Sequence, residues 1–399
     1  MAQKLKFGNG TWATKKGSTL AYNDERGNFK PLPFTTTRDS IATRVNKEGL
    51  IEVVGNGVPR IDYTDSEDGV LLLENSATNY VKHSESIDSW STSFSSLSPN
   101  AITADYEQGP YSNTNADRVQ LTINPSNTVS QIFQVLPLPS GVHTASVWLK
   151  SLSGTPTISI IDGYNTVGSF KLVTLTNEWV RHTLTFTATS SDFIPQFLLI
   201  NGTTSSSADF LAYGFQVEQG SYATSYIPTS GSTVTRQADV ANGSGNSEVF
   251  NDSEGVLFAD VDYLTLSGGD YFGLNDGSNN QRVLIQRSTT NLKAYINSGV
   301  ELIAPISSTI NKISVSYKSN NYKLYLNGFK VATNTSSSVT PSGLNAFEFE
   351  LGGGIGLFAY LKTKEIGYYD EILTDAELEY LTSYRSLNEL VTELNLKAL

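Results

Sequence analysis

Carboxylate pairs at alternate positions are the first residues in this chain that could do chemistry. Asp260-Val-Asp262 and Glu348-Phe-Glu350 each place two acids on one face of an extended strand. Hydrolysis of a glycosidic bond needs an acid and a nucleophile or base on opposite sides of that bond. Neither pair has a third acid in place to complete such a set, so solvated strand faces are favoured. We therefore predict no catalytic residue and a protein that is not an enzyme.

Metal and phosphate sites have little support in the sequence. The histidines His83, His143 and His182 are not spaced as a metal pair or set beside a nucleophile motif. The run 352–356 is rich in glycine but lacks the Lys-Ser/Thr ending of a phosphate loop, and it predicts a tight bend between strands. The run 275–280 offers oxygen ligands for calcium, but Asn, Asp and Gly also form Asx turns, and we favour the turn. No metal and no other cofactor is predicted.

Aromatic side chains offer a different chemistry, the binding of sugars. A flat ring covers the apolar face of a pyranose, while amide and carboxylate groups bond its hydroxyls. The candidates are Trp148, Tyr164 and Trp179 in the middle of the chain and Tyr271 and Phe272 nearer its end. Trp148 and Trp179 lie within strand patterns, which favours burial in a core over exposure as a binding platform. The sequence leaves both alternatives open.

The overall composition limits the possible partners. Lys+Arg 27 against Asp+Glu 39 give a formal net charge of −12, which repels phosphate backbones, so nucleic acid is not expected as a partner. The chain has no cysteine, so neither disulfides nor thiolate metal sites can hold it together. No segment approaches the roughly 20 apolar residues of a membrane span, and the amino terminus lacks a long apolar signal region. We expect no membrane insertion and synthesis in a cytoplasm.

The elements that must position these residues fall into successive parts of the chain. A length of 399 residues predicts two or three domains. Residues 1–78 are rich in Gly and Pro and poor in apolar residues, which predicts an extended arm that leans on another domain or chain. Short alternating runs over 79–228 predict a two-sheet jelly roll, and the polar residues 229–254 predict a linker. The fold class predicted is all-β, with two tandem β-sandwiches after the arm.

The second β-sandwich is predicted over 255–373, again from alternating runs of strand length. Asn327-Gly328 is the strongest hairpin signal, because both residues accept the positive φ of a type I′ turn. Thr374-Asp-Ala-Glu377 is a capping box, which predicts a C-terminal helix in 374–399. We expect the apolar stripe of this helix to pack on the sandwich or on a symmetry-related copy. The stripe is extended by Leu387, Leu390, Leu394 and Leu396.

The last domain resembles a known superfamily in several stretches. These are Tyr322–Ala332, Leu351–Gly354, Lys364–Asp370 and Leu373–Leu378. Together they are similar to the laminin-G-like branch of the concanavalin A-like lectin/glucanase superfamily, over residues 250–385. The resemblance implies a concanavalin A-like sandwich. The Glu-x-Asp-x-x-Glu motif of the glucanases in that superfamily is missing here.

A second resemblance is carried by the order of blocks along most of the chain. The blocks are Arg38–Glu52, Pro59–Tyr63, Leu71–Asn79 and Ala212–Pro228. They resemble bacteriophage virion proteins that carry such sandwiches, and in that family the middle domain is similar to carbohydrate-binding-module jelly rolls. The resemblance implies a head-fibre, tail-fibre or spike component, often trimeric.

From these resemblances we expect a structural virion appendage that forms a homotrimer. Its N-terminal arm, 1–78, is expected to dock on other virion proteins, while the sandwiches are displayed for assembly or host-surface attachment. The alternative is a receptor-binding glycan lectin of the tail, with host-surface glycans as partners. A glycan depolymerase is a third, weaker alternative. The expected location is the virion, after synthesis in the host cytoplasm.

Overall fold

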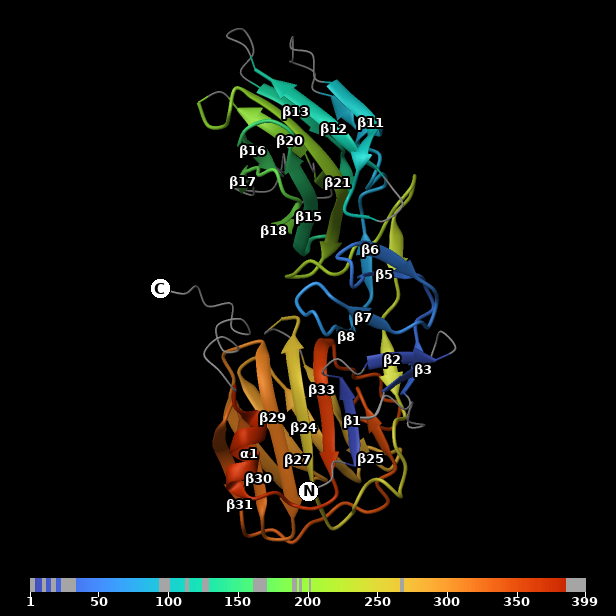
Figure 1. Ribbon diagram of the computed structural model, residues 1–399, viewed down its shortest axis with the longest axis vertical. Helices are drawn as coiled ribbons and strands as arrows, with labels where there is room; N and C mark the ends of the chain where they lie inside the picture. Colours follow the sequence, from blue (N-terminus) through green and yellow to red (C-terminus); the bar gives the residue numbers. More distant parts are fainter. Residues whose placement is uncertain are drawn as a thin grey trace. The chain divides into compact units, whose positions relative to one another are not determined.

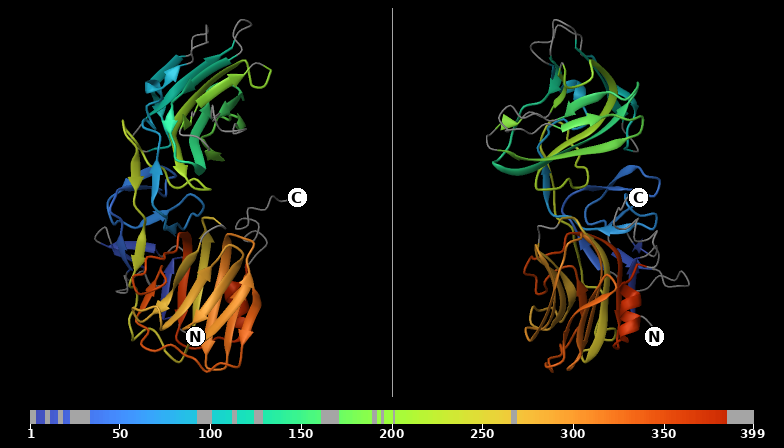
Figure 2. Two further views of the ribbon diagram at one scale, coloured as in Figure 1. Left: turned by 180° about the vertical axis from the view of Figure 1, so that it is seen from behind. Right: turned by 90° about the vertical axis from the view of Figure 1, so that its left-hand side faces the viewer.

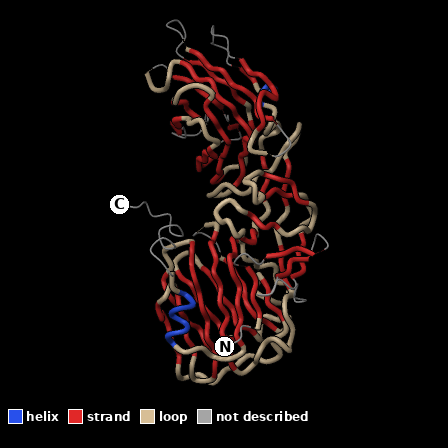
Figure 3. The backbone as a smooth tube through the Cα atoms, in the orientation of Figure 1, coloured by secondary structure: helices blue, strands red, loops and turns tan. Residues whose placement is uncertain are grey.

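A computed structural model describes residues 4–8, 12–15, 19–22, 34–92, 101–111, 115–123, 129–160, 171–188, 192–193, 196–200, 202–265 and 269–384. Strands dominate these residues, which include one α-helix, α1 (Asp375–Thr382), and a short 3-10 turn at Ile87–Ser89 (Figure 3). The predicted all-β class is therefore confirmed. The chain divides into two compact units. The C-terminal unit comprises 1–39, 54–75 and 238–399, and the middle unit comprises 40–53 and 76–237.

The C-terminal unit is built on two antiparallel sheets (Figure 1). The larger runs in the order β31 (Phe329–Asn334), β30 (Tyr322–Leu326), β29 (Ile310–Lys318), β24 (Glu254–Tyr263), β33 (Leu361–Tyr369), β8 (Val70–Leu72), β7 (Arg60–Asp62), with β1 (Leu5–Gly8) also paired to β33. The second runs in the order β28 (Val300–Pro305), β27 (Asn291–Ile296), β26 (Arg282–Arg287), β25 (Asp270–Asn275), β32 (Ala346–Glu348). A small third sheet holds β2 (Trp12–Lys15), β3 (Thr19–Tyr22), β4 (Phe34–Thr37) and β23 (Val240–Asn242).

Figure 2 shows the two large sheets of this unit lying face to face. Alternation along their strands gives them one common core. On β27, Leu292, Ala294 and Ile296 are buried, while the intervening residues turn to the outer face. Leu257 and Val261 of β24 belong to the same buried cluster from the opposite sheet. Two sheets that share a core through their inner faces form a β-sandwich.

Several local signals in the C-terminal unit have the geometry that the sequence predicts. Asn327 and Gly328 have φ of 51° and 87°, and they join β30 to β31 as a hairpin. Gly352–Gly354 also have positive φ, as expected for a tight bend. Asn275 Oδ1 accepts a hydrogen bond of 2.8 Å from Gly277 N, which is an Asx turn.

The helix α1 begins as its capping box predicts. The Thr374 side chain accepts from Glu377 N, and the Glu377 side chain in turn accepts from Thr374 N at 2.8 Å. Leu378 anchors the helix by packing with Val256, Tyr325 and Leu373 in a small buried cluster. The predicted continuation of the stripe, Leu387 to Leu396, lies outside the described residues.

The middle unit also contains two five-stranded antiparallel sheets. One has the order β11 (Ala101–Gln108), β12 (Asn115–Thr122), β21 (Ser207–Gln219), β15 (Gly141–Ser151), β18 (Val180–Ala188). The other has the order β10 (Ser91–Thr92), β13 (Val129–Phe133), β20 (Gln196–Ile200), β16 (Thr157–Ile160), β17 (Lys171–Thr174). A separate core, which includes Val147, Phe197 and Phe215, lies between them. This unit is therefore a second sandwich.

The boundaries of the units differ from the sequence expectation. Residues 1–78 do not form one arm: β1, β7 and β8 extend the large sheet of the C-terminal unit, and 40–53 belong to the middle unit. The expected linker 229–254 contains β22 (Val234–Arg236), which pairs with β9 (Ala77–Asn79), and β23, which pairs with β4. The physical reason is burial. Segments with few apolar residues cannot form a core alone, and here the segments of 1–78 and 229–254 pair with strands of the two units instead.

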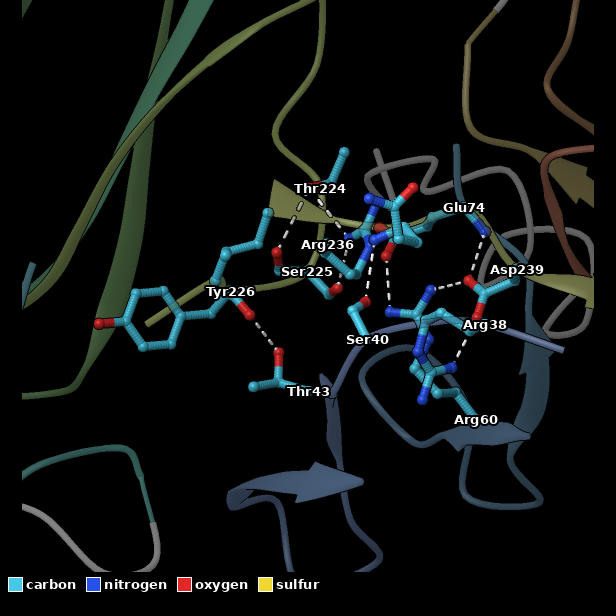
Figure 4. A network of polar contacts seen from close by, with 12 residues as sticks. Arg38, Ser40, Thr43, Arg60, Glu74, Thr224, Ser225, Tyr226, Arg236 and Asp239 are labelled. Carbon is cyan, nitrogen blue, oxygen red and sulfur yellow. Dashed lines mark hydrogen bonds and ion pairs between the residues drawn. The ribbon is translucent and has the colours of Figure 1, made fainter. Parts of the chain in front are cut away.

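A buried ion-pair network joins separate segments of the C-terminal unit (Figure 4). Arg60 is fully buried and pairs with Glu74 at 2.6 Å and with Asp239. Arg38 reaches the other oxygen of Asp239 at 2.7 Å. Two guanidinium groups thus face two carboxylates, which balances the charge that burial would otherwise make costly.

In the middle unit a single buried amide has a similar bridging role. Asn79 Oδ1 accepts from Val81 N at 3.0 Å and from Val217 N at 3.1 Å. Its Nδ2 donates to Ile227 O at 2.9 Å and to Phe215 O at 3.4 Å. The Asn79 side chain therefore links the chain at Val81, which leads into the sandwich, to β21 and to the segment around Ile227 that follows β21.

Candidate functional site

The outer face of the β11-β12-β21-β15-β18 sheet brings two of the predicted aromatic residues together. On β15, Val147 points into the core of the middle unit, so Trp148 points to the outer face. Trp148 pairs across the sheet with Arg181 of β18 on one side and with Tyr213 of β21 on the other. Trp179 lies two residues before Arg181, hence on the same face.

Trp148 is held in place by its neighbours on this face. The Arg181 guanidinium lies 4.3 Å from the ring centroid, and its position is fixed by hydrogen bonds to Thr224 O (2.8 Å) and Ser146 Oγ (2.9 Å). The Tyr226 ring meets Trp148 edge-on at 5.6 Å. Gly214 has a φ of 65°, and a Cβ there would approach the indole to 3.0 Å. Trp148 is therefore half-buried, with one ring face covered by a cation.

Trp179 is also half-buried, and both tryptophans pack on the same small cluster. The members of this cluster that are themselves buried are Ile51, Tyr111, Ala116, Leu211, Tyr213 and Tyr226. Each indole is therefore partly packed against this cluster and partly accessible.

The adjoining strands add charged and amide groups beside the aromatic rings. Arg118 of β12 binds both carboxylate oxygens of Asp209 on β21, at 2.8 and 2.6 Å, and each of the two side chains is 26% exposed. Asp209 also accepts from Gln120 at 3.4 Å. The Arg118 guanidinium lies 4.9 Å from the ring centroid of Tyr106, which is 46% exposed. The hydrogen bonds to Asp209 raise the pKa of Arg118, which therefore stays charged.

A second ion pair completes this surface. Lys150 of β15 and Glu107 of β11 are 3.0 Å apart and partly exposed. We call the surface formed by Tyr106, Glu107, Arg118, Gln120, Trp148, Lys150, Trp179 and Asp209 the aromatic–polar face. It offers flat rings together with donors and acceptors at fixed positions. Such a surface has the chemistry to contact hydroxyl-rich ligands.

The other predicted aromatic residues have different surroundings. Phe272 is fully buried in the core of the C-terminal unit, so it cannot act as the binding platform that the sequence allowed. Its neighbour Tyr271 points the opposite way, is half-buried, and accepts a hydrogen bond from Gln286 Nε2 at 3.2 Å. Tyr164 lies outside the described residues.

Acids of both carboxylate pairs form ion pairs or hydrogen bonds with neighbouring side chains. Asp260 pairs with Lys312 at 3.3 Å, and burial raises the pKa of Asp262. Glu348 accepts from Asn275 at 2.8 Å, and burial likewise raises its pKa. Glu350 accepts from Asn242 at 2.7 Å.

Within the described ranges no group of His, Cys, Asp and Glu side chains is arranged to hold a metal ion. Those ranges also contain no helix long and apolar enough to cross a membrane.

None of the polar residues of the aromatic–polar face was singled out from the sequence. The signal for two of them was present, because the run 116–123 alternates and puts Arg118 and Gln120 opposite the buried Val119 and Leu121. Tyr106 had no such signal, since the run 101–108 lacks a regular apolar alternation.

Comparisons with known proteins give distant likenesses. No known family model matches the sequence, and no curated protein matches it. A carbohydrate-binding module, CBM40 of the Ruminococcus gnavus IT-sialidase bound to α2,3 sialyllactose, is 15% identical with a TM-score of 0.30, covering 36% of this chain and 93% of that one. Mouse laminin α1 domains LG4-5 are 8% identical with a TM-score of 0.23, covering 69% and 92%. Trypanosoma rangeli sialidase in complex with the inhibitor DANA is 12% identical with a TM-score of 0.28, covering 91% and 65%. At these TM-scores the likenesses assign neither a ligand nor an activity to this chain.

Proposed function

We propose that this protein is a glycan-binding display protein that acts without catalysis. The observation that carries the proposal is the aromatic–polar face, where partly exposed rings stand beside partly exposed ion pairs on neighbouring strands of one sheet. The Arg118–Asp209 pair leaves donors and acceptors for vicinal hydroxyls, and the free side of the Tyr106 ring can cover the apolar face of a pyranose.

A glycan array probed with the full chain tests this function, followed by titration of the best ligand into variants. Trp179→Ala and Tyr106→Ala should each weaken binding by about fivefold, because each removes about 1 kcal/mol of ring contact. Tyr380→Ala is the matched control, since Tyr380 is 66% exposed on α1 in the other unit. No glycan bound, or equal loss in the control, would contradict the proposal.

We further propose that the chain is a homotrimeric appendage of a bacteriophage particle that docks on other virion proteins. The support is the sequence resemblance, together with the role of the blocks that carry it. Those blocks supply Arg38, Arg60 and Glu74 to the buried network and Asn79 and Tyr226 to the middle unit, so they contain residues that hold the architecture together.

Particle association is measured separately from glycan binding. Labelled antibody against the chain should decorate purified particles, and mass photometry should give a salt-stable trimer. A monomer that never copurifies with particles would rule out this part of the proposal and leave the glycan-binding part standing.

A further inference from the structure

The outer face of the β28-β27-β26-β25-β32 sheet carries an arginine whose charge is not balanced by a carboxylate among the described residues. Val283 and Ile285 of β26 are buried in the core of the C-terminal unit, so Arg282 points to the opposite, outer face. Its Nε is buried without a hydrogen-bond partner in the described part of the chain. The contact its guanidinium makes is with the ring of Tyr295, whose centroid is 5.7 Å away.

The other arginines described in this unit are paired. Arg287 binds Asp270 at 2.9 Å, Arg38 binds Asp239 at 2.7 Å, and Arg60 binds Glu74 at 2.6 Å. Partial burial lowers the pKa of Arg282, and the Tyr295 hydroxyl opposes that effect. A half-buried guanidinium without a counter-charge is costly, and its fork of N–H donors matches a carboxylate.

The groups around Arg282 favour a ligand that is more than a bare carboxylate. Tyr295 is oriented by a 2.7 Å hydrogen bond from its hydroxyl to Glu301, which also pairs with Lys293 at 2.9 Å. Gln286 is paired across the sheet with Lys293 on one side and Tyr271 on the other. Gln286 and Tyr271 thus lie on the same face as the arginine but four residues further along β26, and the Tyr295 ring is the one beside the guanidinium. A ring next to a guanidinium suits a pyranose that carries a carboxylate.

We propose that Arg282 and Tyr295 form a binding site for an acidic sugar, with Arg282 holding the carboxylate of the sugar and Tyr295 contacting its ring. Glu301 does not compete for Arg282, because Lys293 and the Tyr295 hydroxyl already bind it. The site lies in the C-terminal unit, whereas the aromatic–polar face lies in the middle unit, so variants of Arg282 distinguish binding here from binding on that face.

Saturation-transfer NMR on the full chain tests the site with glucuronate, glucose and acetate as probes. Glucuronate should bind. Glucose lacks the carboxylate and acetate lacks the sugar ring, so each should bind at least about tenfold more weakly than glucuronate. Acetate binding as well as glucuronate would overturn the assignment to a sugar. No glucuronate binding up to about 20 mM, above the millimolar range expected for one ion pair and one ring contact, would overturn the site itself.

Variants locate the binding. Arg282→Gln should reduce glucuronate affinity by at least about tenfold, as expected for loss of a charge-assisted pair. Lys318→Gln is the matched control, because Lys318 is a partly exposed cation of the same unit paired with Glu254.

Arg282→Lys covers the case in which the glutamine variant does not fold. It keeps the charge but loses the forked geometry, so it should bind glucuronate more weakly than the unaltered chain and retain its salt dependence. Unchanged glucuronate binding in folded Arg282→Gln, or equal loss in Lys318→Gln, would refute the role of Arg282.

Discussion

Replacement of Asp239 by alanine should be among the most destabilising single changes in the C-terminal unit. Asp239 accepts from Arg38 Nη1 at 2.7 Å, from Arg60 Nη2, and from Glu74 N at 2.9 Å. The Arg38 and Arg60 side chains are 1% and 0% exposed, so water cannot replace the lost acceptor. The variant therefore removes one of two carboxylates that balance two buried cations.

The magnitude follows from these contacts. Each buried donor left unsatisfied costs about 1–3 kcal/mol, and breaking a buried ion pair by removing one partner costs about 3–5 kcal/mol. We expect Asp239→Ala to lower the free energy of unfolding of the C-terminal unit by about 4 kcal/mol. That is a large fraction of the stability of a typical domain, about 5–15 kcal/mol. Asp239→Asn keeps an acceptor but not the charge, so its cost should be smaller.

Urea unfolding followed by hydrogen-exchange mass spectrometry measures the effect, because peptides covering β7, β8 and β23 report this unit separately from the middle unit. Asp370→Ala is the matched control. Asp370 pairs with Lys4 at 3.2 Å, but the two side chains are 35% and 47% exposed, so its loss should cost less than about 1 kcal/mol. If Asp239→Ala costs no more than Asp370→Ala, the network does not stabilise the unit as argued.

Other predictions concern single features of the two units. Burial raises the pKa of Glu218 above its value in the unfolded chain, so the ionised carboxylate destabilises the folded state at neutral pH. Glu218→Gln should therefore be the more stable protein at pH 7, with the difference disappearing below about pH 4, in thermal melts across pH; a constant difference would contradict the assignment. Gly328→Ala should lower the free energy of unfolding by about 1–2 kcal/mol, because Gly328 has a φ of 87° and a Cβ would lie 2.7 Å from Ser383 Oγ. An unchanged melting temperature would argue against this strain. Thr374→Ala should lower the free energy of unfolding by about 1 kcal/mol and speed hydrogen exchange in α1, because it removes the cap. Exchange at the rate of the unaltered chain would show that packing of Leu378 is enough to hold the helix.

Local features were predictable where one or two residue types dictate the backbone. Asn327-Gly328 tolerates positive φ and indicated the hairpin, and the reciprocal bonds of Thr374 and Glu377 indicated the start of the helix. Alternation along 116–123 also indicated that Val119 and Leu121 share one buried face of their strand. These signals are short-range, so they act the same way in any tertiary context.

The composition of the candidate sites depended on contacts between distant segments. Tyr271 and Phe272 are adjacent aromatic residues on a strand, so one had to face inward and the other outward, and the sequence does not say which. The same limit applied to Trp148, whose half-burial results from Arg181 and Tyr226. The imbalance at Arg282 is visible once the partners of the other arginines are known.

The sequence by itself determined the all-β class, the two sandwiches, the hairpin and the helix start, because periodicity and turn chemistry are properties of neighbouring residues. The tertiary structure decided that residues 1–78 divide between the two units and that Asp239 meets Arg38 and Arg60. Strand pairing and buried ion pairs join residues far apart in the chain, and the local pattern around one partner does not specify the other.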